Sequence, residues 1–331
     1  MKHLICSLVF AFALLFTGAR AYAEPVTVPF KGLNLVGEFV IADGGKPPDH
    51  TILMLHGTLA HLGMETIKGL QATLTERGLN TLSINLSFSL DNRTGMYDCK
   101  IPHRHLYGDA VDELTVWLDW LGKKGIKDVT LFGHSRGGGQ AALFGAQKGH
   151  ALVKRLTLLA PATWNEAKVA KGFQKSHGRP LTQALNDARA MSASGKGNEL
   201  MKRSGILYCP GADVTADSFL SYYEPNTHFD TPSLLPKIKQ PVLVIAGSND
   251  KVVPDVADKV KPLAISDNIR LVTVDGAGHF FHDLFAEDVA DAIEAFQPSK
   301  IFPPGATIDV VAKGGWFLRI EPSSQKTHRF D

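Results

Sequence analysis

Cysteine is scarce in this 331-residue sequence, and so are charge of one sign and long hydrophobic runs. Three cysteines cannot form a zinc site built from cysteine pairs. The 35 Lys and Arg residues are balanced by 33 Asp and Glu residues, without a long basic cluster, so no nucleic-acid partner is expected. A hydrophobic content of 44% without repeats or low-complexity tracts excludes disorder and coiled coils. The sequence is that of a folded globular protein with a small-molecule or polymer substrate.

One apolar run stands at the N-terminus, from Leu4 to Phe16, behind a short basic start. A bilayer span needs about 20 residues, so this run is short for a membrane helix. Small residues follow and end in Ala21-Tyr22-Ala23, an A-x-A pattern. Together these features predict a signal peptide over residues 1–23, a mature start at Glu24, and a periplasmic or secreted protein without a membrane span. The alternative is an uncleaved N-terminal anchor.

Cleavage after Ala23 would change both the charge and the cysteine content. It removes Lys2 and Arg20 but no acid, so 35 minus 2 leaves 33 basic residues against 33 acidic ones, a formally neutral chain. It also removes the first cysteine and leaves an even pair, Cys99 and Cys209. An oxidising compartment permits a bridge between them. They lie about 110 residues apart, so the sequence leaves their pairing open.

Short apolar segments alternate with amphipathic ones along most of the chain. This alternation predicts an α/β fold, with a mostly parallel central sheet flanked by helices. Expected strands are 26–30 and 35–41, which form an antiparallel hairpin, and then 51–55, 79–86, 129–132, 152–160, 242–246 and 269–274. Expected helices are 63–77, 106–121, 137–148, 254–263 and 283–296.

Two stretches depart from this rhythm. Residues 161–236 are long, polar and rich in Gly and Pro, which predicts a cap inserted into the main domain of residues 26–297. Six of the aromatic residues in or beside it should be mostly local core, with one or two lining an acyl pocket: Trp164, Phe173, Phe219, Tyr222, Tyr223 and Phe229. Residues 298–331 form a C-terminal extension, in which 307–311 and 316–320 are expected to pair as a β-hairpin.

The segment Gly133-His134-Ser135-Arg136-Gly137 matches the pattern G-x-S-x-G. It comes directly after an expected strand and directly before an expected helix, the position where this motif forms a sharp turn that exposes a serine. The glycines allow the strained backbone and the close approach of neighbouring chain. Ser135 is therefore the candidate nucleophile. The alternative is a strand-to-helix turn whose serine only caps the helix.

A serine hydroxyl needs a base to take its proton and a carboxylate to orient that base. Asp250 follows the expected strand 242–246, and His279 follows the strand 269–274, so the chain order is Ser, Asp, His. The competing acids are Asp213, Asp217, Asp230 and Asp275, and the competing histidine is His282. Asp250 is preferred because Val-Val-Pro and a helix follow it. His279 is preferred because glycines at 276 and 278 suit a tight loop.

Acyl transfer also needs backbone donors where negative charge develops on oxygen. The turn His56-Gly57-Thr58 follows the strand 51–55, from which a backbone N–H can face the nucleophile. The N–H of Arg136, next to Ser135, is the second expected donor. His56 is expected to brace the turn.

With these residues in view, the sequence resembles the α/β-hydrolase superfamily, specifically its carboxylesterase, lipase and serine aminopeptidase-like group, over residues 26–297. The resemblance implies the α/β-hydrolase fold, a triad of Ser135, Asp250 and His279, and oxyanion-hole residues Thr58 and Arg136. It also implies that residues 161–236 form a lid. Serine at position 135 argues against the haloalkane dehalogenase and epoxide hydrolase branches.

The resulting hypothesis is a serine hydrolase that cleaves an ester through an acyl-enzyme and needs no cofactor. The alternatives are an amidase or peptidase, in which Asp213 or Asp217 would bind an N-terminal amine, and a non-catalytic binding module. Thioesterases, lactonases and perhydrolases share the same residue set. No metal site is expected, because His103, His105 and Cys99 have no second ligand group at convincing spacing.

Overall fold

The computed structural model describes residues 21–42, 50–297, 306–311 and 315–320. The predicted signal peptide lies outside the described residues, except for residues 21–23. Parts of the C-terminal extension, 298–305, 312–314 and 321–331, also lie outside them.

Ten strands form one sheet in the order β1-β2-β4-β3-β5-β6-β9-β10-β11-β12. The strands from β4 to β11 run parallel, whereas β1, β2 and β12 join antiparallel at the two edges. The strands are β1 Tyr22–Phe30, β2 Leu33–Ile41, β3 His50–Leu55, β4 Thr81–Ile84, β5 Asp128–His134, β6 Val153–Leu159, β9 Val242–Gly247, β10 Ile269–Val274, β11 Ala306–Val311 and β12 Gly315–Ile320. The predicted mostly parallel α/β architecture is confirmed.

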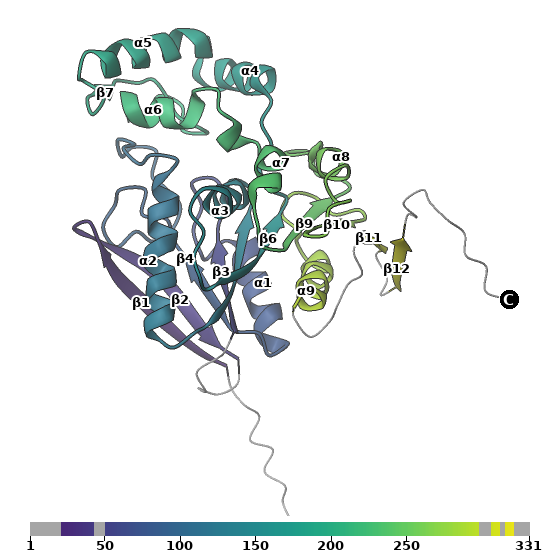
Figure 1. Cartoon of the computed structure of the whole chain (residues 1–331). Coiled ribbons are helices and arrows are strands. Elements are labelled where there is room, and N and C mark those ends of the chain that lie inside the picture. The colour runs from purple at the N-terminus through teal and green to yellow at the C-terminus, as the bar shows by residue number, and fades with distance from the viewer. Residues whose placement is uncertain (1–20, 43–49, 298–305, 312–314, 321–331) are drawn as a thin grey trace, which may run out of the picture.

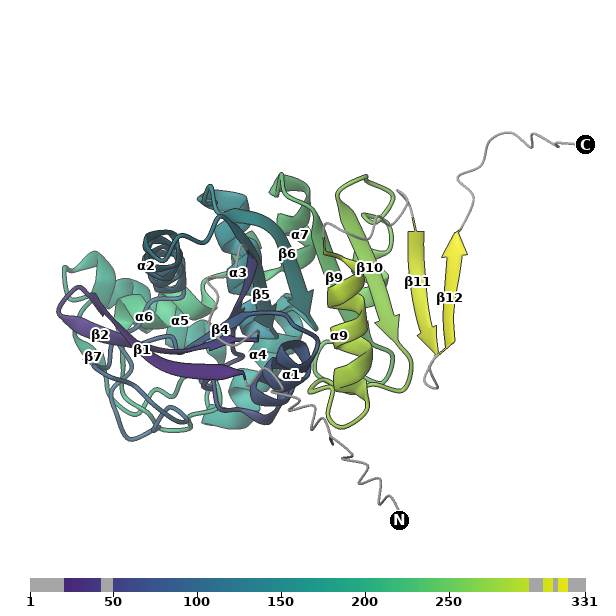
Figure 2. The same cartoon turned by 90° about the horizontal axis from the view of Figure 1, so that it is seen from below.

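Helices cover both faces of this sheet. Helices α1 and α9 pack together on one face, while α2 and α3 lie on the other, as the two views in Figures 1 and 2 show. The bounds are α1 Glu65–Glu76, α2 Asp109–Lys123, α3 Arg136–Gln147, α8 Val256–Val260 and α9 Phe285–Ala295. Helices cover both faces of the central strands, so β5 is buried from Val129 to His134. Burial on both faces is why such strands are mostly apolar in sequence. The edge strand β1 instead alternates near its end, with Val26 and Val28 buried.

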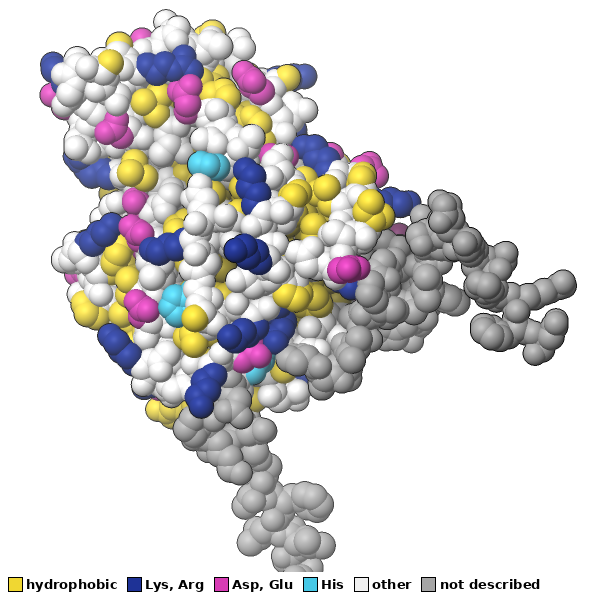
Figure 3. Space-filling view, viewed as in Figure 1, with side chains coloured by type: hydrophobic (Ala, Val, Ile, Leu, Met, Phe, Trp, Pro, Cys, Tyr) yellow, Lys and Arg dark blue, Asp and Glu magenta, His cyan; other side chains and the backbone are white. Residues whose placement is uncertain are grey.

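A smaller unit stands over the end of the sheet where β5 leads into α3 (Figures 1 and 3). It contains α4 Glu166–His177, α5 Leu181–Ala193, α6 Ala216–Tyr223 and the short pair β7 Leu200–Met201 and β8 Val214–Thr215. The rest of the predicted cap, from residue 227, returns to the main body. Its elements η1 Thr227–Phe229, α7 Thr231–Leu234 and η2 Leu235–Lys237 all contact α3.

Several predicted boundaries are wrong by a few residues. Helix α2 begins at Asp109 and not at residue 106, because the Asp109 carboxylate accepts the N–H of Leu106 at 2.7 Å and closes a turn there. Helix α8 covers only five residues, since Pro254 and Asp255 stand in the preceding turn. The C-terminal hairpin is present as β11 and β12, and β11 extends the sheet beside β10.

Candidate active site

Ser135 lies in a strained turn between β5 and α3. Its φ of 55° and ψ of −122° place a non-glycine residue where side chains are rarely found. The two glycines of the motif let the backbone pack this tightly. A Cβ added at Gly133 would lie 2.3 Å from the carbonyl oxygen of Gly137, and one at Gly137 would lie 2.2 Å from that of His56. The strain is therefore held by backbone contacts on both sides of Ser135.

His279 and Asp250 complete a line of hydrogen bonds with Ser135. Nε2 of His279 lies 2.9 Å from Oγ of Ser135, and Nδ1 lies 2.8 Å from Oδ2 of Asp250. The carboxylate accepts the Nδ1 proton, so Nε2 is left as the acceptor for the serine hydroxyl. Asp250 and His279 are buried, at 3% and 7% exposure. The structure thus brings together the three side chains predicted from strands that are far apart in sequence.

The surroundings of Asp250 favour its charged form. Burial opposes ionisation, but hydrogen bonds from His279 and from the N–H groups of Val253 and Val252 outweigh it and lower the pKa of Asp250. Both N–H groups point to Oδ1, at 2.7 Å for Val252 and 2.9 Å for Val253. Oδ2 is thereby left for the histidine. These hydrogen bonds therefore hold the Asp250 carboxylate in position and keep it ionised.

The competing residues have other partners. Asp213 pairs with Lys202 at 2.8 Å, and the remaining three acids accept hydroxyl hydrogen bonds, Asp217 from Ser192, Asp230 from Ser233 and Asp275 from Ser248. His282 stacks on Phe280 and lies 3.8 Å from a carboxylate oxygen of Glu65. None of these five is bonded to Ser135 or His279 in the described part of the chain.

The turn His56-Gly57-Thr58 lies against the serine. A Cβ added at Gly57 would be 3.3 Å from Cβ of Ser135, so the turn and the serine are in van der Waals contact. Nε of Arg136 donates to Oγ1 of Thr58 at 3.1 Å and ties the turn to the start of α3. The N–H of Arg136, the first residue of that helix, has no partner within the helix. The two residues expected to supply backbone donors, Thr58 and Arg136, therefore lie on segments that are directly next to Ser135.

His134 links the loops that carry these groups. Its Nε2 donates to the carbonyl oxygen of His279 at 2.9 Å, and the two rings lie 5.0 Å apart. Its Nδ1 would be 3.4 Å from a Cβ at Gly57. Burial, with the nearby His279, lowers the pKa of His134 to about 4, so the ring is neutral at pH 7. His134 therefore braces the His279 loop without adding charge.

A cavity of about 360 Å³ opens beside Ser135. Its walls are mostly apolar, which suits a small organic ligand. Besides Ser135, His279, Gly57 and Thr58, it is lined by Ala60, Met64, Thr66, Ile67, Met96, His134, Tyr208, Val252 and Phe280.

The expectation that one or two of the six aromatic residues named from the sequence line this cavity is wrong, because none of the six is among its lining residues. Phe173, Phe219 and Tyr223 pack on one another at ring distances of 4.8–5.6 Å and form the core of the cap. The one cap aromatic at the cavity is Tyr208, whose hydroxyl donates to the carbonyl oxygen of Thr58. Sequence reasoning missed it because Tyr208 stands in an irregular loop; its neighbour Cys209 was the only available signal.

The cap is held to the main body at several points. Cys99 and Cys209 form a disulfide, which settles the pairing that the sequence left open. His103 bridges to Val214 by backbone hydrogen bonds, and Nδ1 of His105 lies 3.0 Å from the hydroxyl of Tyr222. These contacts join the irregular segment of residues 87–107 to the cap loop and α6.

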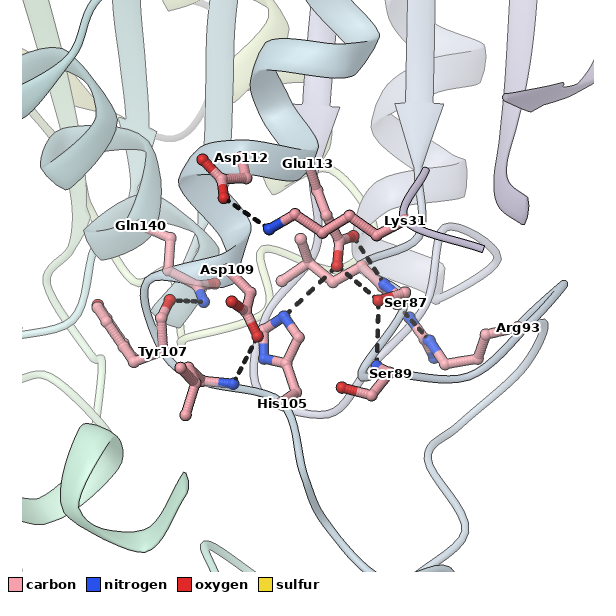
Figure 4. A network of polar contacts seen from close by, with 12 residues as sticks. Lys31, Ser87, Ser89, Arg93, His105, Tyr107, Asp109, Asp112, Glu113 and Gln140 are labelled. Atoms are coloured by element: carbon pink, nitrogen blue, oxygen red, sulfur yellow. Dashed lines mark hydrogen bonds and ion pairs between the residues drawn. The ribbon is translucent and has the colours of Figure 1, made fainter. Parts of the chain in front are cut away.

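A buried polar network lies beneath that junction. Figure 4 shows Glu113, on α2, pointing toward Ser87 and His105. Its carboxylate accepts from the N–H and the hydroxyl of Ser87 at 2.8 and 2.6 Å, and lies 3.5 Å from Nε2 of His105. Because a buried charge needs partners, this network fixes the segment that supports the cap.

The described residues contain neither a metal-binding cluster nor a membrane-spanning helix. No group of three or more His, Cys, Asp and Glu side chains among them is arranged to hold a metal ion. Within the same residues, no helix has both the length and the apolar character that crossing a membrane requires.

Comparison with known proteins gives a family match. Residues 52–292 match the model of the "Alpha/beta hydrolase family", which is more than half of the chain. No curated protein matches the sequence.

Solved structures show the same fold at low identity. Est1E from Butyrivibrio proteoclasticus with ferulic acid bound is 18% identical, with a TM-score of 0.58 over 82% of this chain and 97% of its own. The esterase Pf2001 of Pyrococcus furiosus is 17% identical, with a TM-score of 0.51 over 83% and 89%. A 2,6-dihydroxy-pseudo-oxynicotine hydrolase is 17% identical, with a TM-score of 0.54 over 85% and 70%. At such identities the likeness concerns the fold.

Proposed function

The chain belongs to the alpha/beta hydrolase family, and from this premise we propose that it is a serine esterase, a carboxylic ester hydrolase that forms an acyl-enzyme on Ser135. The observation that carries the proposal is the hydrogen-bonded line from Ser135 through His279 to Asp250, with distances of 2.9 and 2.8 Å. Its substrate is a small ester or other acyl compound.

In the acylation step, Oγ of Ser135 attacks the ester carbonyl carbon while Nε2 of His279 takes the hydroxyl proton. The backbone N–H groups of Thr58 and Arg136 stabilise the negative oxygen of the tetrahedral intermediate. The loss of one such donor typically costs about a hundredfold in rate or more. As the carbon–oxygen bond of the ester breaks, His279 returns its proton to the alcohol oxygen, and the alcohol leaves.

In the deacylation step, water attacks the acyl carbon and His279 takes its proton. The bond to Oγ then breaks, Ser135 recovers the proton, and the carboxylic acid leaves. Asp250 stays ionised throughout and stabilises the imidazolium that forms twice in the cycle. Atoms and charge balance without an oxidant, a reductant or a cofactor.

Two further observations support an ester as the substrate. Est1E, a structural neighbour, holds ferulic acid, a carboxylic acid, and Pf2001 is named as an esterase. An aminopeptidase would need an acid beside Ser135 to bind the amine. The sequence offers Asp213 and Asp217 for that role, but neither is among the described residues that line the cavities beside Ser135.

The test is mass spectrometry of the purified protein after treatment with a fluorophosphonate, followed by assays with 4-nitrophenyl butyrate and the matching 4-nitroanilide. We expect one adduct, located on Ser135, and ester cleavage much faster than anilide cleavage. Ser135→Ala should lose both the adduct and the turnover while its thermal unfolding stays close to that of the parent. Unchanged ester turnover in Ser135→Ala would refute the proposal. Comparable rates on the two substrates would favour the amidase, and a folded protein without adduct or turnover would favour a binding module.

We propose in addition that the protein is exported, with cleavage after Ala23, to the periplasm or the medium. The Cys99–Cys209 disulfide supports an oxidising compartment. Strand β1 starts at Tyr22, so cleavage after Ala23 would remove only the first two residues of this strand. The pairs that Glu24 to Phe30 form with β2 would remain. Cell fractionation and N-terminal mass spectrometry of the full-length gene product test this. A mature start at Glu24 outside the cytosol is expected, whereas an intact N-terminus in the cytosol would contradict it.

A further inference from the structure

A second cavity, of about 520 Å³, also opens beside Ser135. Thr58, Ser135 and Val252 line both cavities, so the serine stands where the two meet. The second cavity is more polar than the first and lies beneath α4 of the cap. Its other lining residues are Arg136, Ala162, Thr163, Asn165, Lys168, Val169, Val253, Pro254 and Asp255.

The charged residues of this second cavity leave an excess of positive charge. Asp255 is already engaged, because it accepts from Oγ1 of Thr163 at 2.7 Å and pairs with Lys259 at 3.1 Å. Lys168 donates to the carbonyl oxygen of Val252 at 2.8 Å, and Arg136 donates to the hydroxyl of Thr58. Within the described part of the chain, neither of these two cations has a carboxylate partner.

The backbone adds to this charge. Helix α3 begins at Arg136, and helix α4 begins at Glu166 after its cap Asn165, whose side chain accepts the N–H of Lys168 at 2.9 Å. Both helices have 12 residues, and both direct an N-terminus toward this cavity. A helix N-terminus carries partial positive charge, which favours an anion near the cations.

The position of His279 decides which part of an ester occupies each cavity. In the proposed reaction, the leaving alcohol must receive its proton from His279. His279 lines the first cavity and is not among the residues of the second. The alcohol part therefore occupies the apolar cavity, and the acyl chain extends past Ser135 into the cavity of Arg136 and Lys168.

We propose that the preferred substrates carry a carboxylate on the acyl part, so that the enzyme hydrolyses monoesters of dicarboxylic acids, with Lys168 and Arg136 binding the free carboxylate. This inference rests on the proposed esterase function and specifies its substrate class. Cationic side chains recognise carboxylates by charge-assisted hydrogen bonds, and both residues have donors left for this.

The experiment compares two esters of equal chain length, 4-nitrophenyl hexanoate and 4-nitrophenyl hydrogen adipate, with Ser135→Ala providing the background rate. The quantity measured is the ratio of kcat/KM for the adipate to that for the hexanoate. We expect a ratio above one that falls about tenfold in Lys168→Gln and further in Lys168→Glu. The matched control is Lys171→Gln, one turn along the same exposed face of α4, which should keep the ratio. The ratio should also fall with added salt, because Lys168 is exposed.

The outcomes separate the two proposals. Turnover of both esters with a ratio that does not respond to Lys168 would overturn the carboxylate subsite and leave the esterase function standing. Absence of turnover with either ester would overturn both. A third pair moves the carboxylate to the alcohol part, using the hexanoate esters of 4-hydroxybenzoate and of phenol. A charge preference seen only with this pair would overturn the assignment of the acyl part to the second cavity.

Discussion

Arg93 and His56 form a buried pair that holds the turn beside Ser135. Nη2 of Arg93 lies 2.9 Å from Nε2 of His56, and Nδ1 of the same ring lies 2.9 Å from the carbonyl oxygen of Gly57. That carbonyl belongs to the same peptide group as the N–H of Thr58. In a trans peptide the two groups point in opposite directions, so a hydrogen bond on the carbonyl fixes where the N–H points.

The protonation of this pair follows from its surroundings. Arginine only donates, so Nε2 of His56 must accept, and Nδ1 then donates to Gly57. Burial, together with Arg93, lowers the pKa of His56 well below its usual range, which keeps the ring neutral. Burial also lowers the pKa of Arg93 to about 10, so the guanidinium is still charged at pH 7. A charged donor behind the imidazole strengthens its bond to the carbonyl.

Replacing Arg93 with methionine should therefore weaken the proposed oxyanion site. We expect kcat for 4-nitrophenyl butyrate to fall about tenfold to a hundredfold while KM changes little, since the N–H of Thr58 acts mainly in the transition state. Steady-state kinetics and the rate of fluorophosphonate inactivation measure this. Arg104→Met, at an exposed arginine of the same segment, is the control. A rise in KM at constant kcat would show that Arg93 has another role.

Replacing Asp250 with asparagine should disable the histidine while the backbone contacts persist. The N–H groups of Val252 and Val253 require an oxygen at the Oδ1 position. The new amide nitrogen must then face Nδ1 of His279, which forces the proton onto Nε2 and removes the base for Ser135. A loss of kcat of about 10⁴ is expected. Asp275→Asn, at the acid that follows β10, should retain nearly full activity; equal losses in both variants would contradict the assignment.

Two glycine-to-alanine substitutions should have opposite effects on stability. At Gly137 a Cβ would lie 2.2 Å from the carbonyl oxygen of His56, so Gly137→Ala must move the turn, lowering both stability and activity. At Gly69, inside α1, a Cβ meets nothing within 4 Å, so Gly69→Ala should raise the free energy of unfolding by about 0.5–1 kcal/mol. Urea unfolding and esterase assays on both variants test the pair. A lower free energy of unfolding in Gly69→Ala would show that the open space around the added Cβ does not determine the effect on stability.

Removal of the disulfide should loosen the cap. The bond closes a long loop, because Cys99 and Cys209 are 110 positions apart in the sequence, and it joins the supporting segment to the loop of Tyr208. The double substitution Cys99→Ser and Cys209→Ser should cost about 2–5 kcal/mol of unfolding free energy. Melting curves with and without a reductant measure it. The reductant should lower the melting temperature of the parent but leave that of the double variant unchanged. A lower melting temperature in both proteins would show that the reductant does not act through the Cys99–Cys209 bond.

Acid should destabilise the protein through three histidines that are buried or partly buried in the fold. Burial lowers the pKa of His50 to about 4, that of His103 to about 3 and that of His134 to about 4. The unfolded chain binds these protons near pH 6.5 but the folded chain does not, so stability is full above about pH 6.5 and falls as the pH drops toward 4.

Each such histidine adds roughly 1 kcal/mol per pH unit to the slope. Unfolding in urea at pH 7, 6 and 5 gives this slope directly. His103→Phe tests one contribution, because the ring packs among Phe88, Tyr97 and Tyr222. The variant should reduce the slope by that amount, and an unchanged slope would show that His103 does not take part.

The sequence by itself predicted the fold class, because buried parallel strands and amphipathic helices leave different periodicities in the chain. It also provided the candidate residues of the site, since the strand-to-helix position of Ser135 and the strand ends before Asp250 and His279 are local signals. The predicted helix boundaries were less accurate than the predicted fold class. Helices α2 and α8 both begin later than expected, because a turn precedes the first helical residue.

Only the tertiary structure decided what surrounds these residues. The pairing of Cys99 with Cys209, the position of Tyr208 at the first cavity and that of Lys168 at the second depend on contacts between segments far apart in sequence. The bond between Arg93 and His56 is of the same kind. Such contacts leave no periodicity in either partner, because each residue stands in a loop or on an exposed helix face. They appear only when the sheet and the cap bring the segments together.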